Sequence, residues 1–418
     1  MAMHTHGTLD DAALFARPTT ELGRLRGQSM LLCLTGVAAS AALGAVGLAF
    51  GKPLVEPGVI WQSYLIAYVF WIGLTLGPLA VLMIQHLTGG AWTFPSRRIL
   101  EAATRNLPLM AVLFIPIAMN LPALYKWAQP VDTLPEEVAH MVHLKAAYLN
   151  PSFFYLRAVI FFVIWGALIF LLNKWSKEQD EQPALPPGPN TRRFRLLSAP
   201  GLILYVLTVT LMSVDWIMSL DPAWYSTIFG ILTIGGQGLS TMAFTIIVLS
   251  GLVKFQPMSR VANLDNFHDL GKLMFAFIML WAYFSVSQLL IIWSANLPEE
   301  IPFYLERLHG PWAPISIAIL LLQFVLPFVM LLSRDLKRNP AAVRWVALLV
   351  LVMRVVDITW TIGPVFRSEG SSLHWLDFAV VFAMGAVWLA LFWRNLAGRS
   401  LVPAHDPYFK EAVAHGGH

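Results

Sequence analysis

The chain has 418 residues, of which 28 are Lys or Arg and 24 are Asp or Glu. Charged residues make up only 12%, about half the ~25% that is usual in soluble domains. Hydrophobic residues make up 57%, and the mean hydropathy is +0.65. This composition excludes a soluble globular domain and predicts a polytopic membrane protein. The small net charge of +4 argues against nucleic-acid binding, and the single cysteine, Cys33, excludes a disulfide framework or a self-held iron–sulfur cluster.

Ten apolar stretches have the length of about 20 residues that a helix needs to cross the hydrocarbon core of a bilayer. They are residues 28–50, 60–84, 107–125, 152–173, 196–219, 226–253, 269–292, 311–333, 341–362 and 374–396. Lipid offers the backbone no hydrogen-bond partner, so each stretch is predicted to be a helix and the fold class is all-α. We expect kinks at the internal prolines, Pro78, Pro116, Pro122 and Pro327.

The distribution of basic residues predicts how the chain is oriented. An even number of spans places both termini on the same side of the membrane, and 21 of the 28 basic residues lie on that side. Five lie on the other side, and two, Arg157 and Arg354, lie within spans. Because loops rich in Lys and Arg remain in the cytoplasm, both termini are predicted to be cytoplasmic.

The ten spans form one transmembrane domain, residues 28–396, between two cytoplasmic ends. Residues 1–27 lack the apolar run of a signal peptide and are predicted to be a cytoplasmic N-terminal segment. Residues 174–195 contain the sequence PALPPGP and are predicted to be a polar cytoplasmic linker. Residues 397–418 are predicted to be a cytoplasmic tail.

Five ionisable residues lie inside the predicted spans, where a charge costs at least about 2.5–3.5 kcal/mol. They are Arg157, Asp215, Arg354, Asp357 and Asp377, and all fall in the half of the membrane opposite the termini. Arg354 and Asp357 are three residues apart, so they share a helix face and can pair. Three carboxylates against two guanidinium groups leave one acid in excess, and we expect its pKa to be raised, as a proton relay or an acceptor of quinol protons requires. The alternative is that these charges only lock helices together.

The cytoplasmic ends of the spans carry a second group of ionisable residues. His86, Glu101, His268, Asp269 and Lys272 are predicted to lie at the cytoplasmic surface, as the mouth of a proton path. The alternative is that the histidines are only interfacial. No pair of histidines lies at matched depth inside the spans, so neither a haem held by this chain nor a metal site is predicted.

Three blocks of sequence resemble one family of membrane proteins. The first, residues 64–117, contains YLIAYVFWIGLTLGPLAVLMIQHLTGG and RRILEAATRNLPLMAVLFIPI. The second, residues 266–312, begins NFHDLGKLMFAF, and the third, residues 354–366, is RVVDITWTIGPVF. They resemble the NrfD/polysulfide-reductase-type membrane subunits. The resemblance is closest to the smaller, second membrane subunit of bacterial alternative complex III, a quinol:cytochrome c oxidoreductase.

The resemblance implies two four-helix bundles flanked by additional helices, in a bacterial cytoplasmic (inner) membrane. It implies several partners: a paralogous NrfD-like membrane subunit, an iron–sulfur subunit, multihaem and monohaem cytochrome c subunits and often a terminal oxidase. The haem c groups and iron–sulfur clusters then belong to those partners, and quinone or quinol is the small molecule to expect. The motif residues that match are His86, His268, Asp269, Glu299, Glu300, Arg354 and Asp357.

Residues and resemblance together predict an integral subunit of a quinol:cytochrome c oxidoreductase in a respiratory or photosynthetic electron-transfer chain. The subunit has no redox centre of its own and is expected to support proton translocation and to contact quinone. The predicted relay runs through Asp215, Asp357 and Asp377, with Arg354 and Arg157 keeping the carboxylates ionised. One alternative is a purely structural subunit that anchors its partners. The other is a secondary transporter, which the lack of visible inverted repeats in the sequence disfavours.

Overall fold

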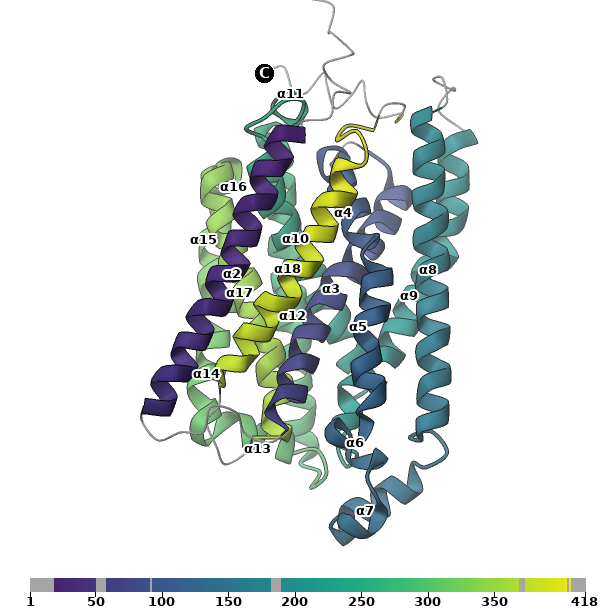
Figure 1. The fold of residues 1–418 in the computed structure, drawn as a ribbon, viewed down its shortest axis with the longest axis vertical. Coiled ribbons are helices and arrows are strands. Elements are labelled where there is room, and N and C mark those ends of the chain that lie inside the picture. Colours follow the sequence, from purple (N-terminus) through teal and green to yellow (C-terminus); the bar gives the residue numbers. More distant parts are fainter. Residues whose placement is uncertain are drawn as a thin grey trace, which may run out of the picture.

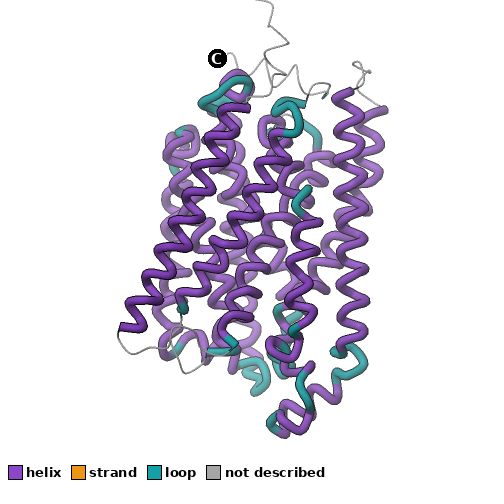
Figure 2. Tube along the Cα trace, in the orientation of Figure 1, coloured by secondary structure: helices purple, strands orange, loops and turns teal. Residues whose placement is uncertain are grey.

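The computed structural model describes residues 19–49, 58–90, 92–181, 189–367, 373–403 and 406. All regular structure in these ranges is helical, and nine of the helices there are long and apolar enough to cross a membrane. The long helices run side by side along the long axis of the molecule (Figures 1 and 2). The prediction of an all-α polytopic membrane protein is therefore confirmed.

The long helices follow the order of the predicted spans. They are α2 (Thr19–Ala49), α3 (Val59–Thr88), α4 (Arg97–Thr104) with α5 (Leu107–Met119), α8 (Pro151–Glu181), α9 (Pro189–Trp216), α10 (Phe229–Leu252), α12 (Leu264–Ala295), α14 (Ala313–Ala318) with α15 (Leu326–Leu332), α17 (Pro340–Ile362) and α18 (Trp375–Ala397). Shorter helices join them: α6 (Leu121–Leu124), α7 (Glu136–Leu144), α11 (Met258–Val261), α13 (Pro302–Leu308) and α16 (Arg334–Arg338). Helix α17 matches the ninth predicted span but is not one of the nine helices counted above, so the number of ten spans stays a prediction.

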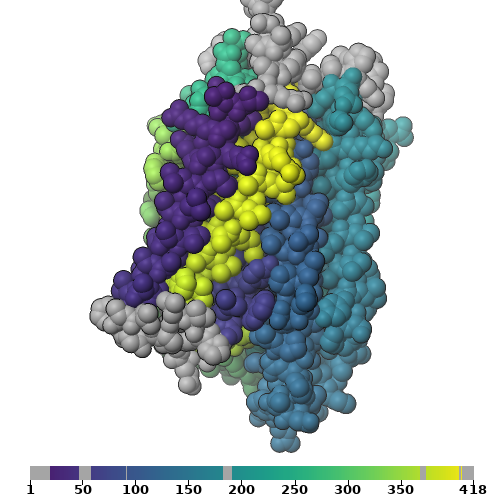
Figure 3. Space-filling view, in the orientation of Figure 1, coloured from purple at the N-terminus to yellow at the C-terminus, as the bar shows by residue number. Residues whose placement is uncertain are grey.

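Helix α3 lies at the centre of the bundle and is buried along most of its length. It packs against α9, α10, α17 and α18. Helix α2 lies at the edge, where it packs along α18 (Figure 3). Leucines on α2 such as Leu31 and Leu34 are exposed. Exposed apolar side chains of this kind suit contact with lipid. The arrangement into two four-helix bundles stays a prediction.

The two ends of the bundle can be told apart by the helices nearest the two chain ends. The beginning of α2 and the end of α18 lie at the same end of the molecule (Figure 1). We call this the inner end and the opposite end the outer end. Residues 1–18 of the predicted N-terminal segment lie outside the described residues, as do 404–405 and 407–418 of the predicted tail. The first helix begins at Thr19 rather than at the predicted residue 28, because polar residues can continue a helix beyond the hydrocarbon core.

The predicted linker, 174–195, is helical at both of its ends. Helix α8 continues to Glu181 and α9 begins at Pro189. The part between them, 182–188, lies outside the described residues. Hydropathy underestimates the length of such helices, because the turns next to the linker are polar.

The predicted limits of the third span, 107–125, are wrong. The helix begins with α4 at Arg97 and ends with α5 at Met119, after a short interruption between the two. Helix α4 carries Arg98 and Glu101 as well as Arg97, so its sequence has the hydropathy of a loop. These opposite charges pair with one another, which allows the whole turn to be buried.

The eighth predicted span, 311–333, is a helix in three parts. A π-helical segment, Ile319–Val325, lies between α14 and α15, directly before Pro327. Proline has no N–H and cannot donate to the preceding turn, and a wider π turn is one way to accommodate it. The helix is therefore irregular near Pro327, whereas α3 continues as one helix past Pro78.

Candidate functional site

Asp357 and Arg354 form a buried ion pair one turn apart on α17. Their side chains are in contact, and the residues are 5% and 6% exposed. Asp357 Oδ2 also accepts hydrogen bonds from Trp281 Nε1 on α12 (3.2 Å) and from Gln323 Nε2 in the π segment (3.3 Å). The prediction that Arg354 and Asp357 pair is confirmed. The two neutral donors were not predicted, because neither is close to Asp357 in the sequence.

The guanidinium group of Arg354 fits against α10 because that helix has a glycine at the contact. A Cβ atom on Gly236 would overlap Arg354 Nη2. Without a side chain, the backbone of α10 can approach the charged group closely. Gly236 thus helps to position Arg354 and, through the ion pair, Asp357.

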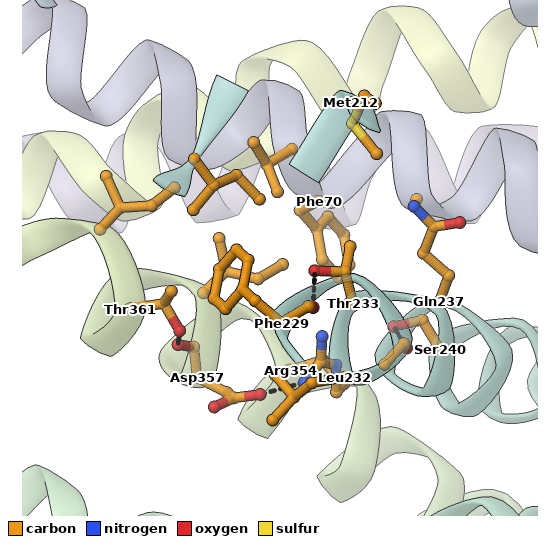
Figure 4. A pocket seen from close by; sticks show the side chains of 16 residues that line it. Phe70, Met212, Phe229, Leu232, Thr233, Gln237, Ser240, Arg354, Asp357 and Thr361 are labelled. Carbon is orange, nitrogen blue, oxygen red and sulfur yellow. Dashed lines mark hydrogen bonds and ion pairs between the residues drawn. The ribbon is translucent and has the colours of Figure 1, made fainter. Parts of the chain in front are cut away.

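A small cavity lies beside this ion pair (Figure 4). Its volume is about 40 Å³, and Arg354, Asp357, Gln237 and Ser240 contribute polar side chains to its wall. Such a cavity has room for a water molecule. Gln237 in turn accepts a hydrogen bond from the buried hydroxyl of Tyr205 (2.7 Å). Polar groups therefore extend from Asp357 toward the interior of the bundle.

On its other side Asp357 lines a much larger pocket, of about 600 Å³. Helices α12, α13, α17 and the π segment form its mainly apolar wall, with a few polar groups such as Gln288, Tyr304 and Ser316. Tyr283 lines the pocket and is exposed on the outside of the bundle, so the pocket opens to the surface that lipid would cover. The volume lies within the ~300–1,000 Å³ typical of small-molecule sites. Asp357 can therefore be reached from the lipid side and from the interior.

A second buried ion pair joins α8 to α9. Arg157 Nε donates to Asp215 Oδ2 (2.7 Å), and the two residues are 5% and 1% exposed. The guanidinium group also lies over the rings of Tyr148 (3.9 Å to the centroid) and Phe153 (4.4 Å). Arg157 is thus held by a carboxylate and by two aromatic faces, which ties the outer ends of α8 and α9 together.

A third buried ion pair involves Asp377, in the first turn of α18. Its carboxylate accepts hydrogen bonds from both Nη atoms of Arg367 (2.9 and 3.0 Å), from Ser63 Oγ (2.6 Å) and from the backbone N–H of His374 (3.0 Å). The expectation that one acid is in excess of the guanidinium groups is therefore wrong. Arg367, which hydropathy assigns to a loop, neutralises Asp377.

The five ionisable residues predicted inside the membrane thus belong to three separate ion pairs, and Asp377 forms the third of these with Arg367. Sequence predicts how far along its helix each residue lies, but helix packing decides which residues meet. Of the three acids, Asp357 is the one that lines both cavities described above. A relay that passes through Asp215, Asp357 and Asp377 in turn stays a prediction.

A structural role of Asp377 can be tested by how its replacement changes the stability of the protein. Asp377→Asn is expected to lower the free energy of unfolding by about 3 kcal/mol, the lower end of what breaking a buried ion pair costs, because Arg367 loses its buried carboxylate while Ser63 keeps a partner. Thermal unfolding of the purified protein measures this change. Asp269→Asn breaks the exposed pair with Lys272 (3.2 Å) and should have little effect. Equal melting temperatures for the two variants would contradict a structural role.

At the inner end, Glu101 lies in a buried network of charges. Its carboxylate pairs with Arg97 (3.0 Å), Arg98 (2.6 Å) and Arg399 (3.5 Å) and accepts a hydrogen bond from Ser176 Oγ (2.7 Å). Glu101 is 3% exposed. The expectation that it lies at the cytoplasmic surface is therefore wrong, because three arginines compensate its charge inside the protein.

The same network joins segments that are far apart in the sequence. Arg98 pairs with Asp180 on α8, and Arg97 pairs with Asp406, beyond the end of α18. Sequence reasoning placed both arginines outside the spans. Their spacing from Glu101 could have indicated that they are buried. Arg97 and Arg98 lie four and three residues before Glu101, so on a helix both arginines face its carboxylate.

The remaining predicted mouth residues lie in two places. His86, on α3, stacks on the ring of Phe194 (4.5 Å between centroids) and lines a cavity of about 30 Å³ next to the Glu101 network. His268, Asp269 and Lys272 lie on α12, where Asp269 and Lys272 form an exposed ion pair. The structure therefore brings His86 close to the Glu101 network, whereas Asp269 and Lys272 pair with each other on α12.

Comparison with known proteins adds no relative. No protein-family model matches the chain, and no curated protein matches its sequence. The resemblance to a family therefore depends on the three blocks of sequence described above.

Proposed function

We propose that this chain is an integral subunit of a quinol:cytochrome c oxidoreductase of the alternative complex III type, and that it moves protons and contacts quinol. The observation that carries the proposal is the position of Asp357, in the wall of both the lipid-side pocket and the internal cavity. The resemblance of residues 64–117, 266–312 and 354–366 to NrfD-type subunits supports the same function.

The lipid-side pocket has the chemistry that a quinol needs. Its apolar wall suits an isoprenoid tail, and Gln288 and Tyr304 offer polar atoms to a ring that carries oxygens. Oxidation of a quinol releases two protons and two electrons. Asp357 accepts the two protons in succession at its carboxylate, passing on the first before it takes up the second, and Trp281 and Gln323 orient that carboxylate. The iron–sulfur and haem groups of the partner subunits would accept the two electrons.

Orientation and assembly follow from the same proposal. The inner end, which holds the beginning of α2 and the end of α18, faces the cytoplasm of a bacterial cell, as the 21 basic residues on that side indicate. The partners are a paralogous NrfD-like membrane subunit, an iron–sulfur subunit, multihaem and monohaem cytochrome c subunits and, in some complexes, a terminal oxidase. Protons collected near Asp357 leave toward the outer end.

Purification from native membranes tests this proposal. A tagged chain in mild detergent is expected to be recovered with c-type cytochromes and an iron–sulfur protein, in a complex that reduces cytochrome c with quinol. Absorbance spectra of reduced haem c and the rate of cytochrome c reduction measure the two properties. Recovery as a single polypeptide that lacks haem would overturn the proposal, and movement of a solute by that polypeptide would favour a secondary transporter.

A structural subunit is the second candidate function, and one observation favours it. Asp215 and Asp377 are each buried and paired with an arginine, as expected for groups that only lock helices together. Asp357 decides between the two functions, because it is paired in the same way but also lines two cavities.

A further inference from the structure

A third cavity continues outward from the Asp357 site. Its volume is about 20 Å³, and its wall includes Thr361, Asp221, Glu306 and Arg307. Thr361 also lines the internal cavity and the lipid-side pocket, as does Phe229. All three cavities therefore share one stretch of wall, one turn beyond Asp357 on α17.

Thr361 provides a hydroxyl group at this junction. Its Oγ1 donates a hydrogen bond to the backbone oxygen of Asp357 (2.8 Å). This bond directs the hydroxyl proton at the Asp357 backbone, while the lone pairs of the oxygen can accept a proton or a hydrogen bond from a neighbour. The threonine passes a proton to the outer cavity when its O–H turns toward that cavity: the oxygen accepts a proton from the Asp357 side as its own proton is donated on the cavity side.

Arg307 is a fixed cation in the wall of the outer cavity. Its guanidinium group donates to the backbone oxygens of Trp360 (3.1 Å), Thr361 (2.6 Å) and Phe303 (2.7 Å), and it lies over the Phe303 ring. Arg307 is 1% exposed. Arg307 thus caps the last turn of α17, and its side chain forms the wall of the outer cavity next to that turn.

Glu306 reaches from this cavity to the outer surface. Its side chain is 41% exposed, and its Oε2 lies 3.8 Å from Arg307 Nη1. Partial burial raises the pKa of Glu306, Arg307 acts in the opposite direction, Asp221 raises the pKa further and Lys126 lowers it. A carboxyl group that touches both the cavity and solvent can take a proton on one side and release it on the other.

We infer that Glu306 is the group that releases protons at the outer end, and that they reach it from Asp357 past the Thr361 hydroxyl. This inference rests on the proposed function. Each transfer breaks one O–H bond and forms another, so no electron or further reactant is needed. Asp221 is less suited to this role, because its Oδ1 already accepts a hydrogen bond from the backbone N–H of Ala223 (3.1 Å).

Substitutions in the assembled complex test the inference. Glu306→Gln is expected to slow quinol-driven proton release roughly tenfold, less than the ~10²-fold of a fully enclosed transfer group, because water reaches its exposed side. Thr361→Val is expected to have a similar effect, while Glu306→Asp and Thr361→Ser restore most of the rate. Glu137→Gln, at an exposed acid of α7 at the same end, serves as the matched control. A pH electrode or dye records proton release, and haem content records assembly.

The outcomes separate this inference from the proposed function. Normal proton release in Glu306→Gln and Thr361→Val, with a defect in Asp357→Asn, would overturn the exit path and leave the proposed function standing. Normal release in all three variants would overturn both. If Glu306→Gln fails to assemble, the comparison of Thr361→Val with Thr361→Ser decides, because only the first removes the hydroxyl group.

Discussion

Replacement of Asp357 by asparagine is expected to lower quinol-driven turnover and proton release by about 100-fold or more, the effect of losing a positioned proton acceptor. Asparagine keeps the size of the side chain but cannot take up a proton at neutral pH. The measurement is cytochrome c reduction with simultaneous recording of proton release in the purified complex. Asp357→Glu, which keeps the carboxyl group, is expected to recover part of the activity.

Loss of the carboxylate also leaves Arg354 without its buried partner, so a matched control is required. Asp215→Asn removes the partner of Arg157 in an ion pair of similar burial, but Asp215 does not line either cavity beside Asp357. Both variants are expected to be destabilised, and Asp357→Asn is expected to lose the larger share of turnover per assembled complex. Turnover that is kept in both variants would favour the structural function, and an equal loss in both would favour the predicted relay through Asp215.

Glu101→Gln is expected to cause the largest loss of stability. Glu101 compensates three arginines inside the protein, and breaking a buried ion pair costs about 3–5 kcal/mol because an uncompensated charge is left behind. Glutamine can still accept a hydrogen bond from Ser176, but it cannot balance Arg97, Arg98 and Arg399. We expect a large drop in melting temperature and a low yield in the membrane.

The control for Glu101→Gln is an exposed pair at the same end of the bundle. Lys177 and Glu181 lie 3.5 Å apart with side chains 63% and 64% exposed, so Glu181→Gln should change stability by less than about 1 kcal/mol. Thermal unfolding in detergent compares the two variants. A small shift for Glu101→Gln would show that the buried network is not needed to hold α4, α8 and the end of α18 together.

Much of the fold follows from hydropathy, because a helix that crosses lipid must be long and apolar. The order of the long helices is found as predicted, and the break near Pro327 lies where proline removes a backbone donor. The errors occur where charge is buried. Arg97 and Glu101 were placed outside the third span because hydropathy treats each charge alone, and only pairing makes their burial possible.

In the candidate site, too, the sequence predicts local contacts but not contacts between helices. Local spacing predicted the Arg354–Asp357 pair, since residues three apart on a helix share a face. It could not predict Trp281, Gln323 or Gly236, which come from other helices. Nor could it predict that Arg367 neutralises Asp377, because that contact joins a loop to the start of α18.

The chain alone thus determines a helical membrane protein, the approximate position of its long helices and the residues whose charge must be compensated. Lipid imposes these features on each segment separately, so the sequence of each segment is sufficient to predict them. The tertiary structure decides which charged groups meet and which of them borders a cavity. Those properties depend on packing between helices that are distant in sequence, and for this reason Asp357 stands apart from Asp215 and Asp377 only in the folded protein.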